Sequence, residues 1–231
     1  MNAFAFFLAV AFVAGDTIET ARYLRPADKQ FEVECEFKLT RSARGSAIES
    51  VTQRGKTKLT VVARYDRADL LLDAEVRLAT GDEKKSAAVT VKAGKATVKR
   101  TGQPAQEFDV PKGVIVTSAP DWTDVWMLCQ RYDRAKGGKQ EFAGLWIHPV
   151  EQCQRLTFII EKTGADTIEH DGKKVMFDRF IIRLRGNSGY AAWADDMGRM
   201  IKLVPLPTKA DATNWLVLQG FEKSAAKLRP Q

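Results

Sequence analysis

Alternation of apolar and polar residues dominates the chain. The stretch FEVECEFKLT, residues 31–40, carries its apolar side chains on one phase: Phe31, Val33, Cys35, Phe37 and Leu39. A period of about two residues is typical of a strand with one buried and one solvated face. We therefore expect a strand here, with these five side chains on its buried face.

Similar segments recur along the whole chain. KLTVVARY, DLLLDAEVRLA, AAVTVK and KATVKR precede residue 120, and EFAGLWI, RLTFIIEK, KKVMFDRFIIRLR, YAAWAD, RMIKLV and NWLVLQGF follow it. Short turns join them, and strands and helices do not alternate as they would in a parallel α/β fold. The pattern predicts a mainly β protein: a curved antiparallel sheet, open barrel or β-roll of roughly a dozen strands.

One segment has the helical period instead. Between Pro120 and Tyr132, apolar residues recur at three- and four-residue spacing: Trp122, Val125, Trp126, Cys129 and Tyr132. This spacing gathers them on one face of an amphipathic helix, with Ser118 as its expected N-cap. We expect the helix to pack its apolar face against the curved sheet.

The N-terminus carries an uninterrupted apolar run, residues 3–14, which is too short for a helix that spans a bilayer in about 20 residues. It has the length of the apolar part of a signal peptide, and Val13-Ala14-Gly15 suits cleavage. We expect residues 1–15 to be a signal peptide, residues 16–231 to be a single β-rich domain, and the mature protein to be periplasmic or secreted. The alternative is a buried first strand or helix, because no Lys or Arg precedes the run.

Two adjacent carboxylates, Asp195 and Asp196, stand out in YAAWADDMGRMIKL. They lie between two alternating segments, where Asp opens a turn by bonding to its own backbone and Gly198 supplies the left-handed residue that closes it. We interpret them as the corner of a hairpin rather than as a catalytic pair. A β-branched residue at position 198 is expected to destabilise the fold.

Histidine, the commonest catalytic base, is scarce. His148, Glu151 and Cys153 form a cluster that resembles a metal site, but Pro149 lies inside it and favours an ordinary loop. His170 lies beside the expected Asp171-Gly172 hairpin turn and is expected to be solvated. Since nucleophile-elbow, phosphate-loop and dinucleotide motifs are also absent from the sequence, we expect no metal, no cofactor and no assigned catalytic residue.

The three cysteines show no metal-type spacing. Cys35 lies on the apolar phase of its strand and is expected to be a small buried residue. Cys129 and Cys153 are possible disulfide partners in an oxidising compartment, although sequence alone does not give their separation.

The net charge of +7 raises the question of a nucleic-acid partner. The basic residues are spread over many strands and acidic residues accompany them, and the aromatic and basic consensus of an RNA-binding sheet is absent. We expect no nucleic acid, and consider an anionic envelope surface the more natural partner of an exported protein.

The second half of the chain resembles secreted bacterial all-β proteins of unknown function, similar in general shape to spiral β-rolls and lipoprotein-carrier half-barrels. The resemblance rests on a helix followed by RYDRAKGG, then FDRFIIRL, and then YAAWADDMGRMIKL. It implies an extracytoplasmic location and a curved sheet wrapped around a helix. It carries over no catalytic residue, and Asp16 stands where a lipid-anchored member would have cysteine.

These observations favour binding over catalysis. The leading hypothesis is that a curved sheet carries an apolar or lipid-like envelope ligand, with Trp126, Trp146 and Trp193 lining part of the cavity. The alternatives are a hydrolase or lyase acting on an envelope component and a structural interaction module. The simpler interpretation of the three tryptophans is that all are core residues with no role in binding.

Overall fold

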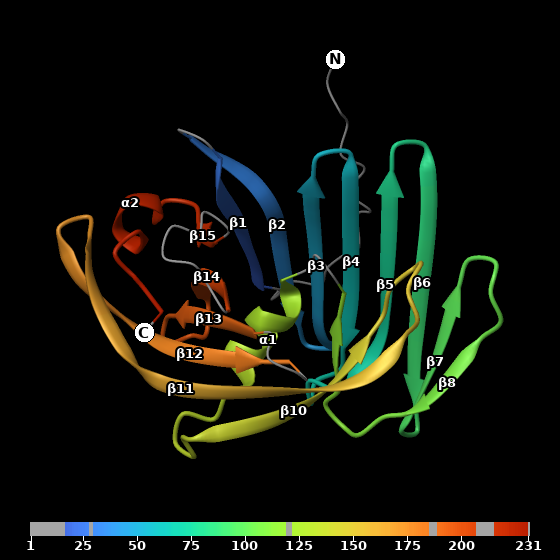
Figure 1. Ribbon diagram of the computed structural model, residues 1–231. Coiled ribbons are helices and arrows are strands. Elements are labelled where there is room, and N and C mark those ends of the chain that lie inside the picture. The colour runs from blue at the N-terminus through green and yellow to red at the C-terminus, as the bar shows by residue number, and fades with distance from the viewer. Residues whose placement is uncertain (1–16, 28–29, 119–121, 185–188, 207–214, 231) are drawn as a thin grey trace.

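The structure is a computed structural model that describes residues 17–27, 30–118, 122–184, 189–206 and 215–230. Within these ranges, fifteen strands form one sheet, accompanied by two helices (Figure 1). The first nine strands are β1 (Thr17–Ala27), β2 (Gln30–Ser42), β3 (Gly45–Arg54), β4 (Thr57–Tyr65), β5 (Leu71–Thr80), β6 (Glu83–Lys92), β7 (Lys95–Arg100), β8 (Gln106–Asp109) and β9 (Ile115–Thr117).

The remaining elements are α1 (Thr123–Arg131), β10 (Lys139–Trp146), β11 (Gln154–His170), β12 (Lys173–Arg183), β13 (Gly189–Ala194), β14 (Met200–Leu206), β15 (Leu216–Leu218) and α2 (Glu222–Ala225). The predicted fold class is confirmed: one large curved sheet dominates the molecule. The expected signal peptide, residues 1–15, lies outside the described residues.

The sheet is an open roll. Its order is β8-β7-β6-β5-β4-β3-β2-β1-β15-β14-β13-β12-β11-β10-β9, so β8 and β9 are the free edges of its described part. All neighbours are antiparallel except β9 and β10. Arg100 Nη1 donates to Glu151 O at 2.8 Å, and Arg155 Nη1 donates to Asp109 O at 3.2 Å. Arginine side chains thus link β7 and β8 to the start of β11, where the described chain has no backbone ladder.

The hairpins follow the turn chemistry of the sequence. Asp171 and Gly172, between β11 and β12, have φ of 49° and 74°, and Ala93 and Gly94, between β6 and β7, have φ of 51° and 78°. Two successive positive φ angles are characteristic of type I′ turns, whose twist matches that of the flanking strands. The predicted Asp171-Gly172 hairpin is confirmed, and Ala93-Gly94 forms a turn of the same kind.

Helix α1 lies inside the curve of the sheet (Figure 1). The ring of Trp126 lies 4.6 Å from that of Phe37 on β2, and the ring of Tyr132, at the end of α1, lies 5.1 Å from that of Phe180 on β12. The helix therefore bridges the two halves of the roll, and its apolar face forms the centre of the inner core, as the helical period predicts.

The helix begins later than the sequence suggests. Ser118 was expected to cap it, but α1 starts at Thr123, with Trp122 in the N-cap position and no side-chain cap bond. The expected first-turn residue Pro120 lies outside the described residues. Asp124 supplies the acidic group of the first turn, where it is favoured by the helix dipole.

The C-terminal segment covers the outer face of the sheet. On β12, Phe180 faces α1, so its neighbour Arg179, which pairs with Trp193, points outward. Trp193 in turn pairs with Lys202 on β14. Lys202 Nζ donates to Ala225 O and Leu228 O, each at 2.8 Å, so the outward row lies under α2 and the residues after it.

Lys202 is a buried cation in this outer layer. The rings of Trp215 and Trp193 lie 4.3 Å and 5.8 Å from its Nζ. Burial, with a smaller contribution from Arg229, lowers the pKa of Lys202 to about 8. The two carbonyl acceptors and the indole faces supply the partners that a buried ammonium group requires.

A bulge in β2 reverses the predicted faces of its first half. Tyr23 on β1 pairs with Cys35, but Leu24 pairs with Val33, so Glu34 is the extra residue. Glu34 is only 2% exposed, whereas Phe31 and Val33 are 39% and 47% exposed. The expectation of a continuous buried phase is therefore right from Cys35 onward and wrong for Phe31 and Val33.

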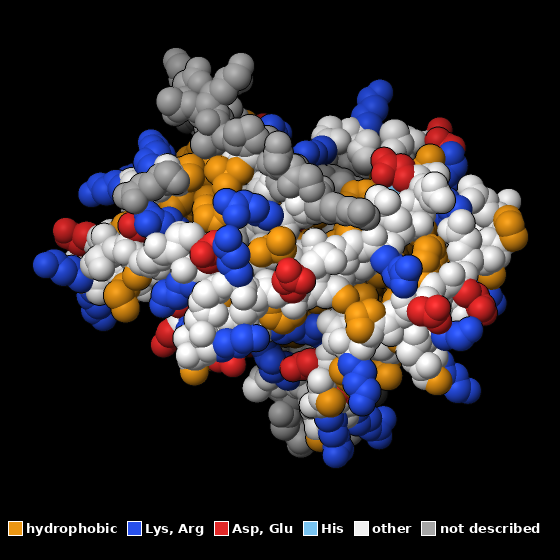
Figure 2. Space-filling model, turned by 60° about the horizontal axis from the view of Figure 1, so that its bottom comes forward, with side chains coloured by type: hydrophobic (Ala, Val, Ile, Leu, Met, Phe, Trp, Pro, Cys, Tyr) orange, Lys and Arg blue, Asp and Glu red, His pale blue; other side chains and the backbone are white. Residues whose placement is uncertain are grey.

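The surface charge is dispersed. Figure 2 shows Lys and Arg side chains interspersed with Asp, Glu and hydrophobic groups on the displayed face, without a single continuous basic patch. Among the described residues, neither helix is long and apolar enough to cross a bilayer.

Gly198 provides a test of how the β13–β14 hairpin packs. Its φ is +78°, and an added Cβ would lie 2.8 Å from Gln130 Cα on α1. We expect Gly198→Val to reduce the free energy of unfolding more than Gly55→Val, by about 1 kcal/mol or more, because Gly55 shares a positive φ but has nothing within 4 Å of its Cβ position. Urea unfolding of both variants measures the difference; equal losses would show that the contact with α1 is unimportant.

Candidate functional site

The structure does not gather the three predicted tryptophans in one cavity. Trp126 lies on α1 inside the roll, and Trp193 points into the outer layer beneath the C-terminal segment. Trp146 ends β10, where its half-buried ring stacks on His148 with 6.1 Å between the ring centroids. The three tryptophans that were predicted to line one cavity thus lie on different sides of the sheet.

Trp193 is a fully satisfied core residue. Its Nε1 donates to Asp166 Oδ2 at 2.7 Å, and Arg179 Nη1 lies 3.4 Å from the same carboxylate oxygen. The ring is completely buried. Trp193 is therefore a core residue, since its indole N–H already has a protein partner.

Trp126 differs from Trp193 in the hydrogen bonding of its indole N–H. The side chain is 2% exposed, yet its Nε1 has no hydrogen-bond partner among the described residues. The buried Nε1 of Trp122, the N-cap residue of α1, is unpartnered in the same way. A buried N–H without an acceptor costs about 1–3 kcal/mol, so each of these two groups would be stabilised by a bound acceptor.

Polar and aromatic groups from the strands lie beside Trp122. The Arg54 guanidinium lies 5.7 Å from the ring of Trp122, whose other neighbour is the ring of Tyr190 at 5.6 Å. Arg54 also donates to Glu34 Oε1 through Nε at 2.8 Å. We refer to Glu34, Arg54, Trp122, Trp126 and Tyr190 as the tryptophan cluster.

The bulge in β2 gives this cluster its carboxylate. Glu34 Oε2 lies 2.8 Å from Arg25 Nε, although both atoms lack the alignment of a hydrogen bond. Two guanidinium groups thus stabilise one buried carboxylate, which is the usual requirement for burying such a charge. The cluster extends from the partly exposed Arg54 to the buried Glu34 and Trp126.

Two buried hydroxyl groups outside the named cluster are also unpartnered. Thr52 follows the inner phase of β3, opposite Cys35, and Ser118 precedes α1; the buried Oγ1 and Oγ of these residues also have no partner in the described part of the chain. Burial, followed by the charge of Asp124, raises the pKa of Tyr190 to about 12, so its phenol remains a neutral donor. The site therefore offers hydrogen-bond donors and aromatic faces rather than a proton-transfer group.

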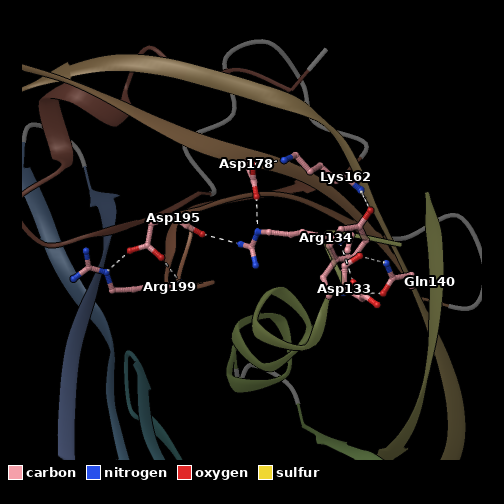
Figure 3. Close-up of polar contacts among 9 residues, drawn as sticks. Asp133, Arg134, Gln140, Lys162, Asp178, Asp195 and Arg199 are labelled. Carbon is pink, nitrogen blue, oxygen red and sulfur yellow. Dashed lines mark hydrogen bonds and ion pairs between the residues drawn. The ribbon is translucent and has the colours of Figure 1, made fainter. Parts of the chain in front are cut away.

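A separate polar group fixes the end of α1 to the sheet (Figure 3). Arg134 donates from Nε to Asp178 Oδ2 at 2.7 Å and from Nη2 to Asp195 O at 2.8 Å. Lys162 Nζ lies 2.6 Å from Asp178 Oδ1. This arrangement joins RYDRAKGG, FDRFIIRL and YAAWADD, the three segments on which the sequence resemblance rests, and it uses both oxygens of Asp178 within the protein.

The predicted hairpin at Asp195 and Asp196 is confirmed. Asp195 Oδ1 accepts from the backbone of Arg199 at 2.8 Å, and Gly198 N donates to Asp195 O at 3.0 Å. Asp196 is exposed and does not share this turn network among the described contacts. The two carboxylates have divergent environments, and turn formation accounts for the first of them.

Both histidines have partners within the protein. His148 Nδ1 accepts from the backbone of Val150 at 3.3 Å and Glu151 at 3.1 Å, and burial lowers its pKa. No group of three His, Cys, Asp or Glu side chains in the described ranges has the arrangement of a metal site. His170 was expected to be solvated, but its ring stacks on Phe221 at 3.9 Å.

The open possibility of a Cys129–Cys153 disulfide is not realised. Both residues are buried free thiols, Cys129 on α1 and Cys153 in the loop before β11, where its Sγ lies 3.9 Å from His148 O. Burial raises the pKa of Cys129 to about 12, so this thiol stays protonated and unreactive. Cys35 is buried, as predicted.

Comparisons with known proteins bear on the fold. No protein-family model matches the chain, and no curated protein matches its sequence. A beta-barrel-like protein of the domain of unknown function DUF1849 from Brucella abortus is similar in structure, with a TM-score of 0.52 and 8% identity over 87% of this chain and 93% of that chain. A DUF1089 family protein from Pseudomonas aeruginosa has a TM-score of 0.47 and 12% identity over 87% and 95% of the two chains.

The likeness to the DUF1849 structure shows a barrel-like all-β fold. It agrees with the resemblance to all-β proteins of unknown function, and at this identity it transfers no site and no activity.

The anchoring group predicts a specific pH dependence. Its two cationic partners lower the pKa of Asp178 despite the opposing effect of burial. A lowered carboxyl pKa contributes stability that is present above the unfolded-state pKa and is lost as the pH falls through the folded-state pKa. We expect Asp178→Asn to cost about 2 kcal/mol at pH 7, and less at pH values low enough to protonate the native carboxylate.

Urea unfolding from pH 7 down to the acid limit of folding measures this dependence. Asp73→Asn is the control, because it removes an exposed partner of Arg64, and a change of about 0.5 kcal/mol or less is expected. A pH-independent loss in Asp178→Asn would contradict the electrostatic role.

Proposed function

We propose that the protein is exported and binds, without converting it, an apolar or lipid-like molecule of the cell envelope at the tryptophan cluster. The observation that carries the proposal is that the buried Nε1 atoms of Trp126 and Trp122, at the N-terminal end of α1, have no hydrogen-bond partner among the described residues. A ligand oxygen that reached either indole would accept its N–H group. The free energy of that hydrogen bond, which the empty site does not make, would then contribute to the affinity.

The chemistry of the cluster favours an amphipathic ligand. The rings of Trp122 and Tyr190 supply apolar surface, while the indole N–H groups and Arg54 supply donors for an ester, carboxylate or phosphate oxygen. The central apolar space of the roll is already filled by α1. We therefore place the ligand at the N-terminal end of α1 rather than along the whole concave face.

Binding is favoured over hydrolysis or elimination because the acidic and phenolic groups of the cluster are already engaged or neutral. The carboxylate of Glu34 is held by Arg25 and Arg54, and the raised pKa of Tyr190 makes its phenolate scarce at neutral pH. The described members of the cluster thus include no ready general base. An anionic envelope surface remains a reasonable partner for the net charge of +7 once the protein is exported.

Substitution of the two buried tryptophans tests the ligand site. We expect dansyl-labelled undecanoic acid to bind saturably, and Trp126→Phe to weaken it about fivefold to tenfold because one donor is lost. Trp193→Phe is the matched control: it removes an equally buried indole whose N–H is already bonded to Asp166. It is expected to lower stability and leave affinity unchanged.

The emission of the dansyl group reports binding without relying on the tryptophans that are being replaced, and circular dichroism establishes that each variant is folded. Absence of saturable binding, or the same affinity in wild type and Trp126→Phe, would reject the tryptophan cluster as the ligand site.

Export is tested separately by N-terminal sequencing of the protein from a bacterial host. We expect the mature chain to begin at or near Asp16, because the apolar run and Val13-Ala14-Gly15 have the pattern of a signal peptide. Recovery of intact Met1 from the soluble cytoplasmic fraction would contradict both cleavage and the proposed compartment.

A further inference from the structure

A second pocket lies apart from the tryptophan cluster, where the β11–β12 turn meets α2 and the first residues of β2. Its volume is about 800 Å³, and its wall includes Phe31, Glu169, His170, Asp171, Lys223 and Ser224. The volume falls within the usual range for small-molecule sites. The tryptophan cluster contributes no residue to this wall.

The pocket has a fixed side wall. His170 stacks nearly parallel to Phe221, with ring centroids 3.9 Å apart and an interplanar angle of 15°. Its Nδ1 lies 3.1 Å from Ser224 Oγ. Phe177 also contacts Phe221, edge-on, with 5.9 Å between the ring centroids. A side chain positioned by both stacking and a hydrogen bond is prearranged to meet a ligand.

The bulge in β2 supplies an aromatic group to the same pocket. It turns Phe31 to the outer face, where the side chain is 39% exposed, and Trp215 holds its ring in an edge-on contact at 5.7 Å. An exposed phenyl ring kept in place by a second aromatic residue offers an apolar platform beside polar groups.

Charges of both signs surround this platform. Glu169, Asp171 and Glu222 are acidic, whereas Lys223 and Lys227 are basic. Within the described contacts, Asp171 approaches His170 at 3.6 Å, and the other four form no ion pair. The nearly balanced signs provide little net attraction for a simple anion or cation, but they offer both donors and acceptors.

We propose that this pocket is a saccharide-binding site. Sugar hydroxyl groups both donate and accept hydrogen bonds, so they match a wall of carboxylates, ammonium groups and a Ser–His pair. The apolar C–H face of a pyranose ring matches the exposed phenyl group of Phe31. The site is independent of the proposed lipid-like ligand, because the two sets of residues are separate.

Calorimetric titration with tri-N-acetylchitotriose and with maltotriose tests the site. We expect saturable binding of at least one, an approximately tenfold loss in Phe31→Ala, and a smaller loss in Ser224→Ala. Val150→Ala is the control for truncating an exposed apolar residue outside the pocket, since Val150 is 49% exposed. It is expected to bind as wild type does.

Trp126→Phe separates this proposal from the previous one. Saccharide affinity that is unchanged in Trp126→Phe and reduced in Phe31→Ala supports the pocket, whatever the result with the fatty-acid probe. Absence of saturable binding of both trisaccharides, or equal affinity in Phe31→Ala and wild type, would overturn it.

Discussion

One extra residue in β2 determines how both faces of the roll are used. The bulge at Glu34 lets the strand keep its ladder with β1 while the side chains before it take the faces opposite to those that regular alternation would give. On the inner side it introduces a carboxylate that must be neutralised, and Arg25 and Arg54 provide the positive charge. On the outer side it exposes Phe31 next to the C-terminal segment. Each candidate site therefore contains a group that regular alternation would have placed on the opposite face.

The two buried tryptophans illustrate how the same residue type serves different ends. Trp193 has its N–H bonded to Asp166 and its ring packed near Lys202, so it stabilises the outer layer without further partners. Trp126 packs equally well against Phe37 but keeps an unbonded N–H. Since burial without a partner opposes folding, the inner cluster is the less stable arrangement of the two when empty. A ligand there would add stability as well as occupancy.

The periodicities in the sequence predicted the strands, the central helix and the main hairpins, because these depend on local spacing and on Asp and Gly in turns. The face of Glu34 was not predictable, since a bulge arises from pairing with a strand elsewhere and leaves no local signal. The pattern likewise identified Trp126 as a buried helical residue, but not its missing acceptor. His170 was misjudged for the same reason: Phe221, which covers it, lies far along the chain.

The open seam of the roll affects how its curvature is maintained. Between β8 and the start of β11, arginine-to-carbonyl bonds take the place of a continuous ladder, and such exposed contacts contribute little each. The radius of the roll is therefore set mainly by the width of α1 and of the aromatic rings that pack around it. A change in the separation of the strands at the seam would break these arginine contacts but no backbone hydrogen bond of the main sheet.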